Sequence, residues 1–185
     1  ASDRRACRRH ASRAGKAGLN QSSVQAEPAL QAPATFVFGT AGDFGANSAT
    51  AASLNALAGA NTDFFLALGD LSYDEIKPEL AWCDYVKQRV GSTYPFELLV
   101  GNHEWRSSGP DGFIDTYAGC LPDRLGVSGR YAHRYYFDYP PGAPVARFIL
   151  IDPDIYRDDV MQEYCTGGDT ANCDWLKARI DEAKS

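Results

Sequence analysis

Three short apolar stretches, each ending on glycine and polar residues, constrain this sequence more than any other feature. The stretches cover residues 36–38, 64–68 and 96–100. An apolar run of this length that is bounded by glycine is typical of a buried strand, and an α/β fold carries its chemistry where such strands end. The sequence therefore predicts an α/β fold in which three strands bring oxygen ligands to one edge of a sheet. The residues at the three ends are Gly39-Thr40-Ala41-Gly42-Asp43, Gly69-Asp70-Leu71-Ser72-Tyr73 and Gly101-Asn102-His103-Glu104.

The carboxylates at this predicted edge indicate a metal site. Carboxylates at the rim of one sheet repel each other unless protons or cations compensate their charge, and oxygen donors select hard cations. Asp70 can bridge two metals through its two oxygens. Asp43 and the phenolate of Tyr73 would complete one side, and Asn102 would supply a carbonyl oxygen to the other. Such a pair of metals could activate water and hold a phosphoryl group.

The three strand ends resemble the first three of the five motifs of the calcineurin-like metallophosphoesterases, in the purple acid phosphatase branch. Two linked departures from the wider superfamily suggest this branch. Gly45 stands where many members carry a metal-binding histidine, and Tyr73 offers a phenolate in its place. The resemblance runs from about residue 35 to the C-terminus. It implies the N-terminal portion of a calcineurin-like sandwich, with mixed β-sheets flanked by helices.

The resemblance also implies a role for each candidate site residue. Asp43, Asp70 and Tyr73 would bind ferric iron, which suits a phenolate ligand. Asp70 and Asn102 would bind a divalent ion, namely iron, zinc or manganese. His103 would act on the substrate and the leaving group without binding a metal. The expected substrate is a phosphate ester.

Two further motifs of the resembled family, Val-x-x-His and Gly-His-x-His, do not occur in this sequence. Its three histidines are His10 in a polar tail, His103 at the predicted site and His133 in a predicted aromatic strand. None of them can replace three missing imidazole ligands, and His133 is expected to be a packed or surface residue of its strand. The isolated chain is therefore expected to be a weak or inactive enzyme.

The sequence leaves three functional hypotheses open. The leading one is the N-terminal half of a secreted, acid-phosphatase-like hydrolase of phosphoric esters that uses a two-metal site. The second is a non-catalytic, secreted interaction module on a truncated phosphoesterase scaffold. The third is one chain of a processed two-chain enzyme, in which a C-terminal segment or a second chain supplies the missing histidines.

Composition divides the chain into a basic arm and an acidic domain. Residues 1–33 carry six basic and two acidic residues, lack aromatic residues, and are predicted to be a disordered arm or pro-segment. Residues 34–185, the predicted phosphoesterase portion, carry 12 basic and 22 acidic residues. This acidity argues against nucleic acid as the principal partner and suits cation binding. No apolar run approaches the length of a membrane span.

Five cysteines in 185 residues favour an oxidising compartment, and hence a secreted protein. Cys165 and Cys173 flank a flexible, glycine-containing segment that a local disulfide could close. Cys83 and Cys120 are a second candidate pair, which leaves Cys7 without a predicted partner. The alternative is that all five are reduced thiols. A structural zinc site is not expected, because the sequence has no Cys-x-x-Cys or cysteine–histidine cluster.

The remaining patterns predict the helices and strands around the site. A helix capped by Asn47 or Ser48 should end near Gly59, and a second helix should begin at Pro78 with Trp82 in the core. Residues 105–129 are predicted to be a long loop at the site edge. Residues 131–138 and 145–151 should form a hairpin. A last helix near residues 174–184 should turn Trp175, Leu176 and Ile180 inward.

Overall fold

A computed structural model of the chain describes residues 35–104, 113–152 and 171–184. The predicted arm at residues 1–33 lies outside these ranges, so the proposed domain boundary stays a prediction. Within the described ranges, no helix is both long enough and apolar enough to cross a membrane.

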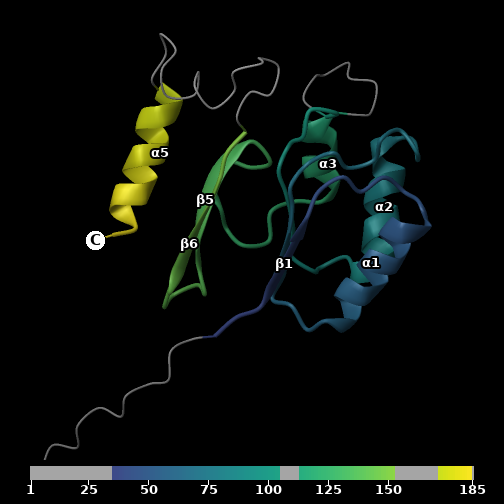
Figure 1. Ribbon diagram of the computed structural model, residues 1–185, viewed down its shortest axis with the longest axis horizontal. Coiled ribbons are helices and arrows are strands. Elements are labelled where there is room, and N and C mark those ends of the chain that lie inside the picture. Colours follow the sequence, from purple (N-terminus) through teal and green to yellow (C-terminus); the bar gives the residue numbers. More distant parts are fainter. Residues whose placement is uncertain (1–34, 105–112, 153–170, 185) are drawn as a thin grey trace, which may run out of the picture. The chain divides into compact units, whose positions relative to one another are not determined.

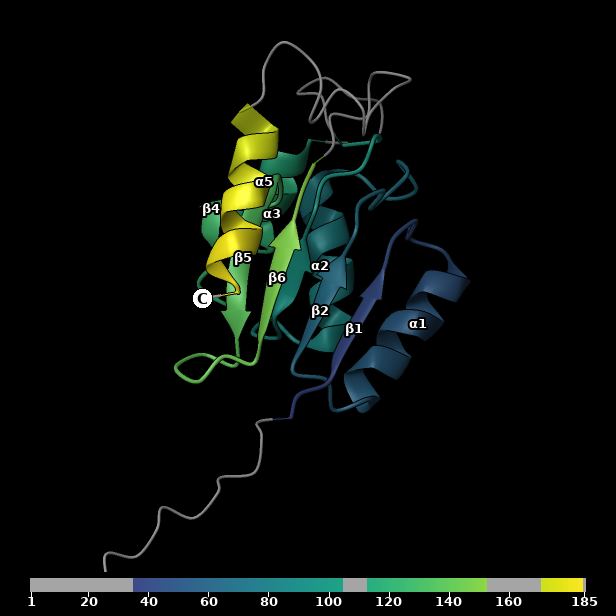
Figure 2. The same ribbon diagram turned by 60° about the vertical axis from the view of Figure 1, so that its left-hand side comes forward.

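The first sheet is parallel, with strand order β1-β2-β3. Its strands are β1 (Phe38–Ala41), β2 (Phe64–Ala67) and β3 (Phe96–Leu98). All of β2 is buried, because Phe65 packs with the helices on one face and Phe64 packs with a second sheet on the other. This burial on both faces explains the unbroken apolar run. The parallel order places the loops that follow all three strands at one edge of the sheet, as predicted (Figure 2).

The first strand begins later than predicted and continues through a glycine. A side-chain carbon at Gly39 would lie 2.6 Å from the ring of Phe65. The glycine therefore makes room for this ring within the strand and does not end the strand. The third strand is shorter than predicted: it ends at Leu98, and Leu99 forms an isolated bridge with Ala132 while its N–H still donates to Ala67 of β2.

Two predicted helices, α1 (Ser48–Gly59) and α2 (Glu79–Val90), cover one face of this sheet (Figure 1). The side chain of Asn47 accepts two backbone N–H groups of the first turn of α1, which confirms the predicted cap. Pro78 immediately precedes α2, as predicted. Trp82 is fully buried in the core between the helices and the sheet.

The second sheet is antiparallel and packs on the other face of the first sheet through an aromatic core. It comprises β4 (Ser128–Arg130), β5 (Arg134–Tyr139) and β6 (Ala146–Leu150), and the pairing of β5 with β6 confirms the predicted hairpin. The ring of Phe64 in the first sheet lies 5.4 Å from that of Phe137. Parallel and antiparallel sheets with helices outside them form the predicted α/β sandwich.

The prediction of one long loop over residues 105–129 is wrong in part. Residues 105–112 lie outside the described ranges, but a short helix, α3 (Ile114–Cys120), follows them. Ile114 and Tyr117 are buried in the core beside α2, and this burial stabilises a segment too short for its periodicity to identify it.

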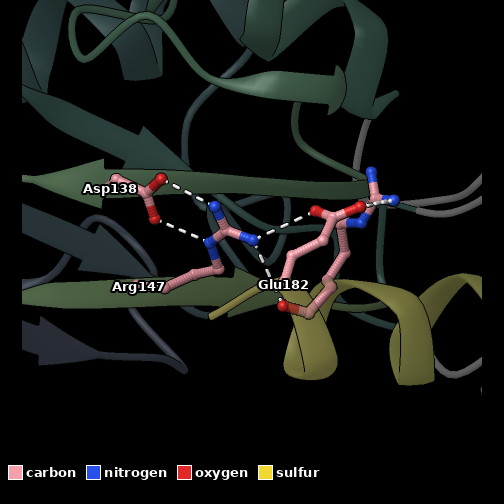
Figure 3. Close-up of polar contacts among 4 residues, drawn as sticks. Asp138, Arg147 and Glu182 are labelled. Carbon is pink, nitrogen blue, oxygen red and sulfur yellow. Dashed lines mark hydrogen bonds and ion pairs between the residues drawn. The ribbon is translucent and has the colours of Figure 1, made fainter. Parts of the chain in front are cut away.

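The last helix, α5 (Ala171–Glu182), is held largely by arginine side chains. Arg147 of β6 forms a bidentate ion pair with Asp138 of β5, at 2.6 and 2.7 Å. It also donates a hydrogen bond to Glu182 of α5 at 3.2 Å (Figure 3). Arg147 also lies 4.5 Å from the ring centre of Tyr136. The prediction that Ile180 faces inward is wrong, since this residue is exposed. Charged and aromatic contacts replace the apolar face that the pattern suggested.

The candidate disulfide between Cys83 and Cys120 is present and joins α2 to the end of α3. Cys173 is also disulfide-bonded. Its predicted partner, Cys165, lies outside the described residues, so that pairing stays a prediction.

Replacing both Cys83 and Cys120 by alanine should lower the free energy of unfolding by about 3 to 4 kcal/mol. The crosslink closes a loop with a sequence separation of 37 residues and so restricts the unfolded chain. Urea unfolding of the variant and of the parent protein, both without reductant, measures the difference. An unchanged unfolding free energy would contradict this expectation.

Candidate metal centre

The three loops that carry the predicted ligands touch one another at the edge of the first sheet. The backbone N–H of Asp43 donates to the carbonyl of Gly69 at 3.2 Å, and that of Phe44 donates to the carbonyl of Asp70 at 2.8 Å. A side-chain carbon at Gly69 would lie 2.5 Å from the Cα of Gly101. Glycine is therefore required where the second and third loops meet, which explains why the sequence motifs contain it.

Three of the predicted ligands have left-handed backbone conformations. The φ angles are 56° at Asp43, 53° at Asp70 and 48° at Tyr73. Such a conformation costs a residue other than glycine about 1 to 3 kcal/mol, and it concentrates at functional sites. All three residues lie in the segments that follow β1 and β2, so the backbone itself supports a functional role for this edge.

The side chains of these three residues converge on the hydroxyl of Tyr73. This hydroxyl donates to Asp43 Oδ1 at 2.5 Å and lies 3.1 Å from Asp70 Oδ2. The hydrogen bond to Asp43 is the main reason why the pKa of Tyr73 is raised above its ordinary value, and burial and Asp70 add to the effect. In the absence of a cation, the phenol proton thus helps to compensate the two carboxylates.

The third loop lies beside this group of oxygens. The backbone N–H of His103 donates to Asp70 Oδ1 at 3.3 Å, and the imidazole centre lies 4.3 Å from the ring centre of Tyr73. The neighbouring Asn102 is exposed on the same loop. The structure therefore brings together Asp43, Asp70, Tyr73 and His103, and Asn102 directly precedes His103 in the chain.

The sequence predicted no role for Glu104, the last residue of the third motif. The structure buries it completely. Its Oε1 accepts the backbone N–H of Leu71 at 2.6 Å, and its Oε2 accepts those of Asp70 at 3.0 Å and Gly101 at 3.3 Å. Burial raises the pKa of Glu104 to about 7, and the backbone donors partly oppose this shift. The only sequence signal that this carboxylate binds the backbone of the two loops is its place directly after a buried strand and its polar turn.

The oxygen donors of Asp43, Asp70 and Tyr73 fit a single hard cation. Neighbouring ligands of an ion with bonds of about 2.0 to 2.1 Å lie roughly 3 Å apart, which is close to the separations around the Tyr73 hydroxyl. Residues 35–104, 113–152 and 171–184 contain no group of three histidine, cysteine or acidic residues that could hold a metal. The donor set here has two carboxylates and a phenol, so its ability to bind a cation depends on Tyr73.

A second polar cluster surrounds His133, just before β5. His133 Nε2 lies 3.1 Å from Asp115 Oδ1, and Nδ1 lies 3.7 Å from Asp152 Oδ2. The two ring nitrogens face different carboxylates, so the three residues do not surround one ion. His133 is buried, as expected of a packed residue, but the prediction that it belongs to a strand is wrong, because β5 begins at Arg134.

Residues 37–177 match the family model described as Calcineurin-like phosphoesterase. The chain therefore belongs to the calcineurin-like phosphoesterase family, and its fold is the one that the resemblance implied. This membership indicates phosphoester hydrolysis, and enzymes of the family generally use a dinuclear metal centre. Searches of curated proteins and of solved structures returned no match.

Proposed function

We propose that this chain provides the ferric side of a two-metal phosphoester hydrolase of the purple acid phosphatase branch. The observation that carries the proposal is the convergence of two carboxylates on the Tyr73 hydroxyl, at 2.5 Å from Asp43 and 3.1 Å from Asp70. A phenolate is a suitable ligand for a trivalent ion, and Gly45 leaves the position of the alternative histidine empty. A side-chain carbon at Gly45 would press on the carboxylate of Glu75.

Each residue of the centre has a proposed part. Asp43 and Tyr73 would hold the ferric ion, Asp70 would serve both ions, and Asn102 would contribute an oxygen to the divalent ion. The bound cations would polarise the phosphoryl group and activate water. His103, held beside Tyr73, contacts the phosphoryl group and supplies a proton to the departing oxygen.

The disulfide between Cys83 and Cys120 supports an oxidising compartment for the protein. We propose a secreted location on this ground. A phosphate ester is the proposed substrate, and a further polypeptide segment that carries imidazole ligands is the proposed partner of the centre.

The 185-residue chain should hold at most one metal ion firmly and should show negligible turnover of p-nitrophenyl phosphate. Counted from this chain alone, the ferric site has three protein ligands and the divalent site has two, and the latter should bind its ion weakly. Metal analysis after dialysis and a phosphatase assay measure both quantities. Adding a segment that carries the missing histidines should restore activity.

Two other results have clear meanings. Two tightly held metals and robust turnover, abolished by Asp70→Ala, would show that the ligand count is wrong. A chain that binds neither ferric iron nor a divalent ion, with or without an added segment, would refute the proposed centre and favour the non-catalytic interaction module.

A further inference from the structure

The buried carboxylate of Glu104 joins two loops that are remote in the sequence. It accepts N–H groups from Asp70 and Leu71 in the loop after β2, and from Gly101 in the loop after β3. The two ends of this connection are separated by about 30 residues of chain that include the whole of α2. No solvent competes for these bonds, because Glu104 is fully buried.

The two loops would otherwise be hard to hold in this arrangement. Their backbones approach so closely at Gly69 and Gly101 that neither position has room for a side-chain carbon. Asp70 has a strained, left-handed backbone. Without Glu104, the N–H of the buried Leu71 would lose the partner that it has in the structure, and an unsatisfied buried donor destabilises its surroundings.

The orientation of the Asp70 carboxylate depends on this connection. Asp70 Oδ1 accepts the N–H of His103, which belongs to the third loop, whereas Oδ2 faces the Tyr73 hydroxyl of its own loop. A relative shift of the two loops would therefore separate Asp70 from one partner or the other. The carboxylate of Glu104 is bonded to backbone N–H groups of the two loops, so its effect on the Asp70 side chain would pass through the backbone.

We propose that Glu104 is a positioning residue that sets the distance between Asp70 and the Asn102–His103 loop, and thereby the metal affinity of the centre. The part concerning affinity rests on the proposed function. The claim that Glu104 sets the distance between the two loops applies to the metal-free chain, so it can be tested without any metal.

Glu97 provides a matched control. It is also a fully buried glutamate, and burial raises its pKa to about 7, as it does for Glu104. Its Oε1 accepts the backbone N–H of Arg124 at 2.9 Å, in a segment that carries no predicted ligand. Glu97→Gln therefore makes the same substitution at a buried glutamate, but one whose hydrogen bond to Arg124 lies outside the two ligand loops.

The test compares Glu104→Gln, Glu104→Ala and Glu97→Gln by amide hydrogen exchange in the metal-free chain. In Glu104→Ala, the amides of Asp70, Leu71 and Gly101 should exchange at least about tenfold faster. The amide of His103, which donates to Asp70 Oδ1 in the structure, should follow them. Glu104→Gln keeps one acceptor oxygen and should be intermediate. Because Glu97→Gln is expected to stabilise the whole fold above pH 4, it should change these four rates by no more than it changes those of core amides such as that of Phe65.

The second measurement is titration with ferric iron and with Zn²⁺, followed by calorimetry and, for iron, by the visible absorption of a tyrosinate complex. The Glu104 variants should bind about 10- to 100-fold more weakly than the wild-type chain, the usual effect of losing a residue that orients ligands. Glu97→Gln should bind as the wild type does.

The outcomes separate the two proposals. Unchanged exchange at His103 in a folded Glu104→Gln or Glu104→Ala variant overturns the positioning role, and so does unchanged metal affinity in both variants. If the wild-type chain binds no metal while the exchange pattern appears as expected, the proposed function fails and the coupling of the loops by Glu104 stands.

Discussion

The Asp70→Asn variant should bind ferric iron and divalent ions more than about 100-fold more weakly than the wild-type chain. In the proposed centre, Asp70 is the one side chain that would serve both ions, so its loss should exceed the 10- to 100-fold effect typical of outer-shell partners. Asparagine tolerates the left-handed backbone found at residue 70. Its carbonyl oxygen can still accept a hydrogen bond from His103 or Tyr73. The fold should therefore survive the substitution.

The same variant should keep or increase the thermal stability of the metal-free chain. Asp70 lies beside Asp43, across the shared hydroxyl of Tyr73, and its backbone N–H is bonded to the carboxylate of Glu104. Removing one negative charge from this group reduces repulsion that no cation compensates. Lost binding with retained stability is the behaviour of a functional residue, since such sites commonly trade stability for activity.

Asp74→Asn is the matched control for this prediction. Asp74 lies in the same loop and also has a left-handed backbone, with φ of 60°, but its carboxylate pairs with Lys77. The substitution should leave metal affinity close to that of the wild type. Calorimetric titration and thermal unfolding of both variants test the difference. An equal loss of affinity in the two variants would mean that the loop as a whole, and not the Asp70 carboxylate, determines binding.

The convergence of the predicted ligands could be read from the sequence because it follows from local patterns. Buried apolar runs identify parallel strands, and glycine with a polar residue marks where each run ends. Once β1, β2 and β3 are parallel neighbours, Asp43, Asp70 and the third loop must share an edge. Metal binding by these residues stays a prediction, as does the purple acid phosphatase branch.

The role of Glu104 could not be read in the same way. Its carboxylate accepts hydrogen bonds from backbone N–H groups. Such groups do not depend on the side chain, so no sequence motif can show which of them a glutamate will bind. Two of those amides belong to residues 33 and 34 positions away from it. Only the packed arrangement of the loops shows why an acidic residue is buried there.

The errors in the fold have related causes. The helix α3 was missed because its burial, and its disulfide to α2 through Cys120, stabilise it from outside its own short sequence. The predicted inward face of α5 was wrong at Ile180, because apolar periodicity assumes an apolar partner. Its actual partner face offers Tyr136 and Arg147, so Trp175 and Arg179 make contacts there while Ile180 is exposed.

The Glu97→Gln variant should be more stable than the wild-type chain at pH 8, by up to about 3 kcal/mol, and should lose this advantage at pH 4. Burial raises the pKa of Glu97 from 4.5 to about 7, and each unit of difference between the folded and unfolded states corresponds to about 1.4 kcal/mol. Glutamine keeps an oxygen that can accept the N–H of Arg124. It never carries the charge that burial disfavours.

The sign follows from the protons bound in each state. As the pH rises from 4.5 to 7, the unfolded chain releases the Glu97 proton while the folded chain retains it, so this group lowers the stability of the wild type across that window. Above pH 7 the full cost is present, because the buried carboxylate is then charged. The Asp84→Asn variant removes an exposed carboxylate of α2 and is the control for the loss of a surface charge. Urea unfolding of the three proteins at pH 4, 6 and 8 measures these differences. If the difference in unfolding free energy between Glu97→Gln and the wild type is the same at all three pH values, Glu97 does not retain its proton in the folded chain.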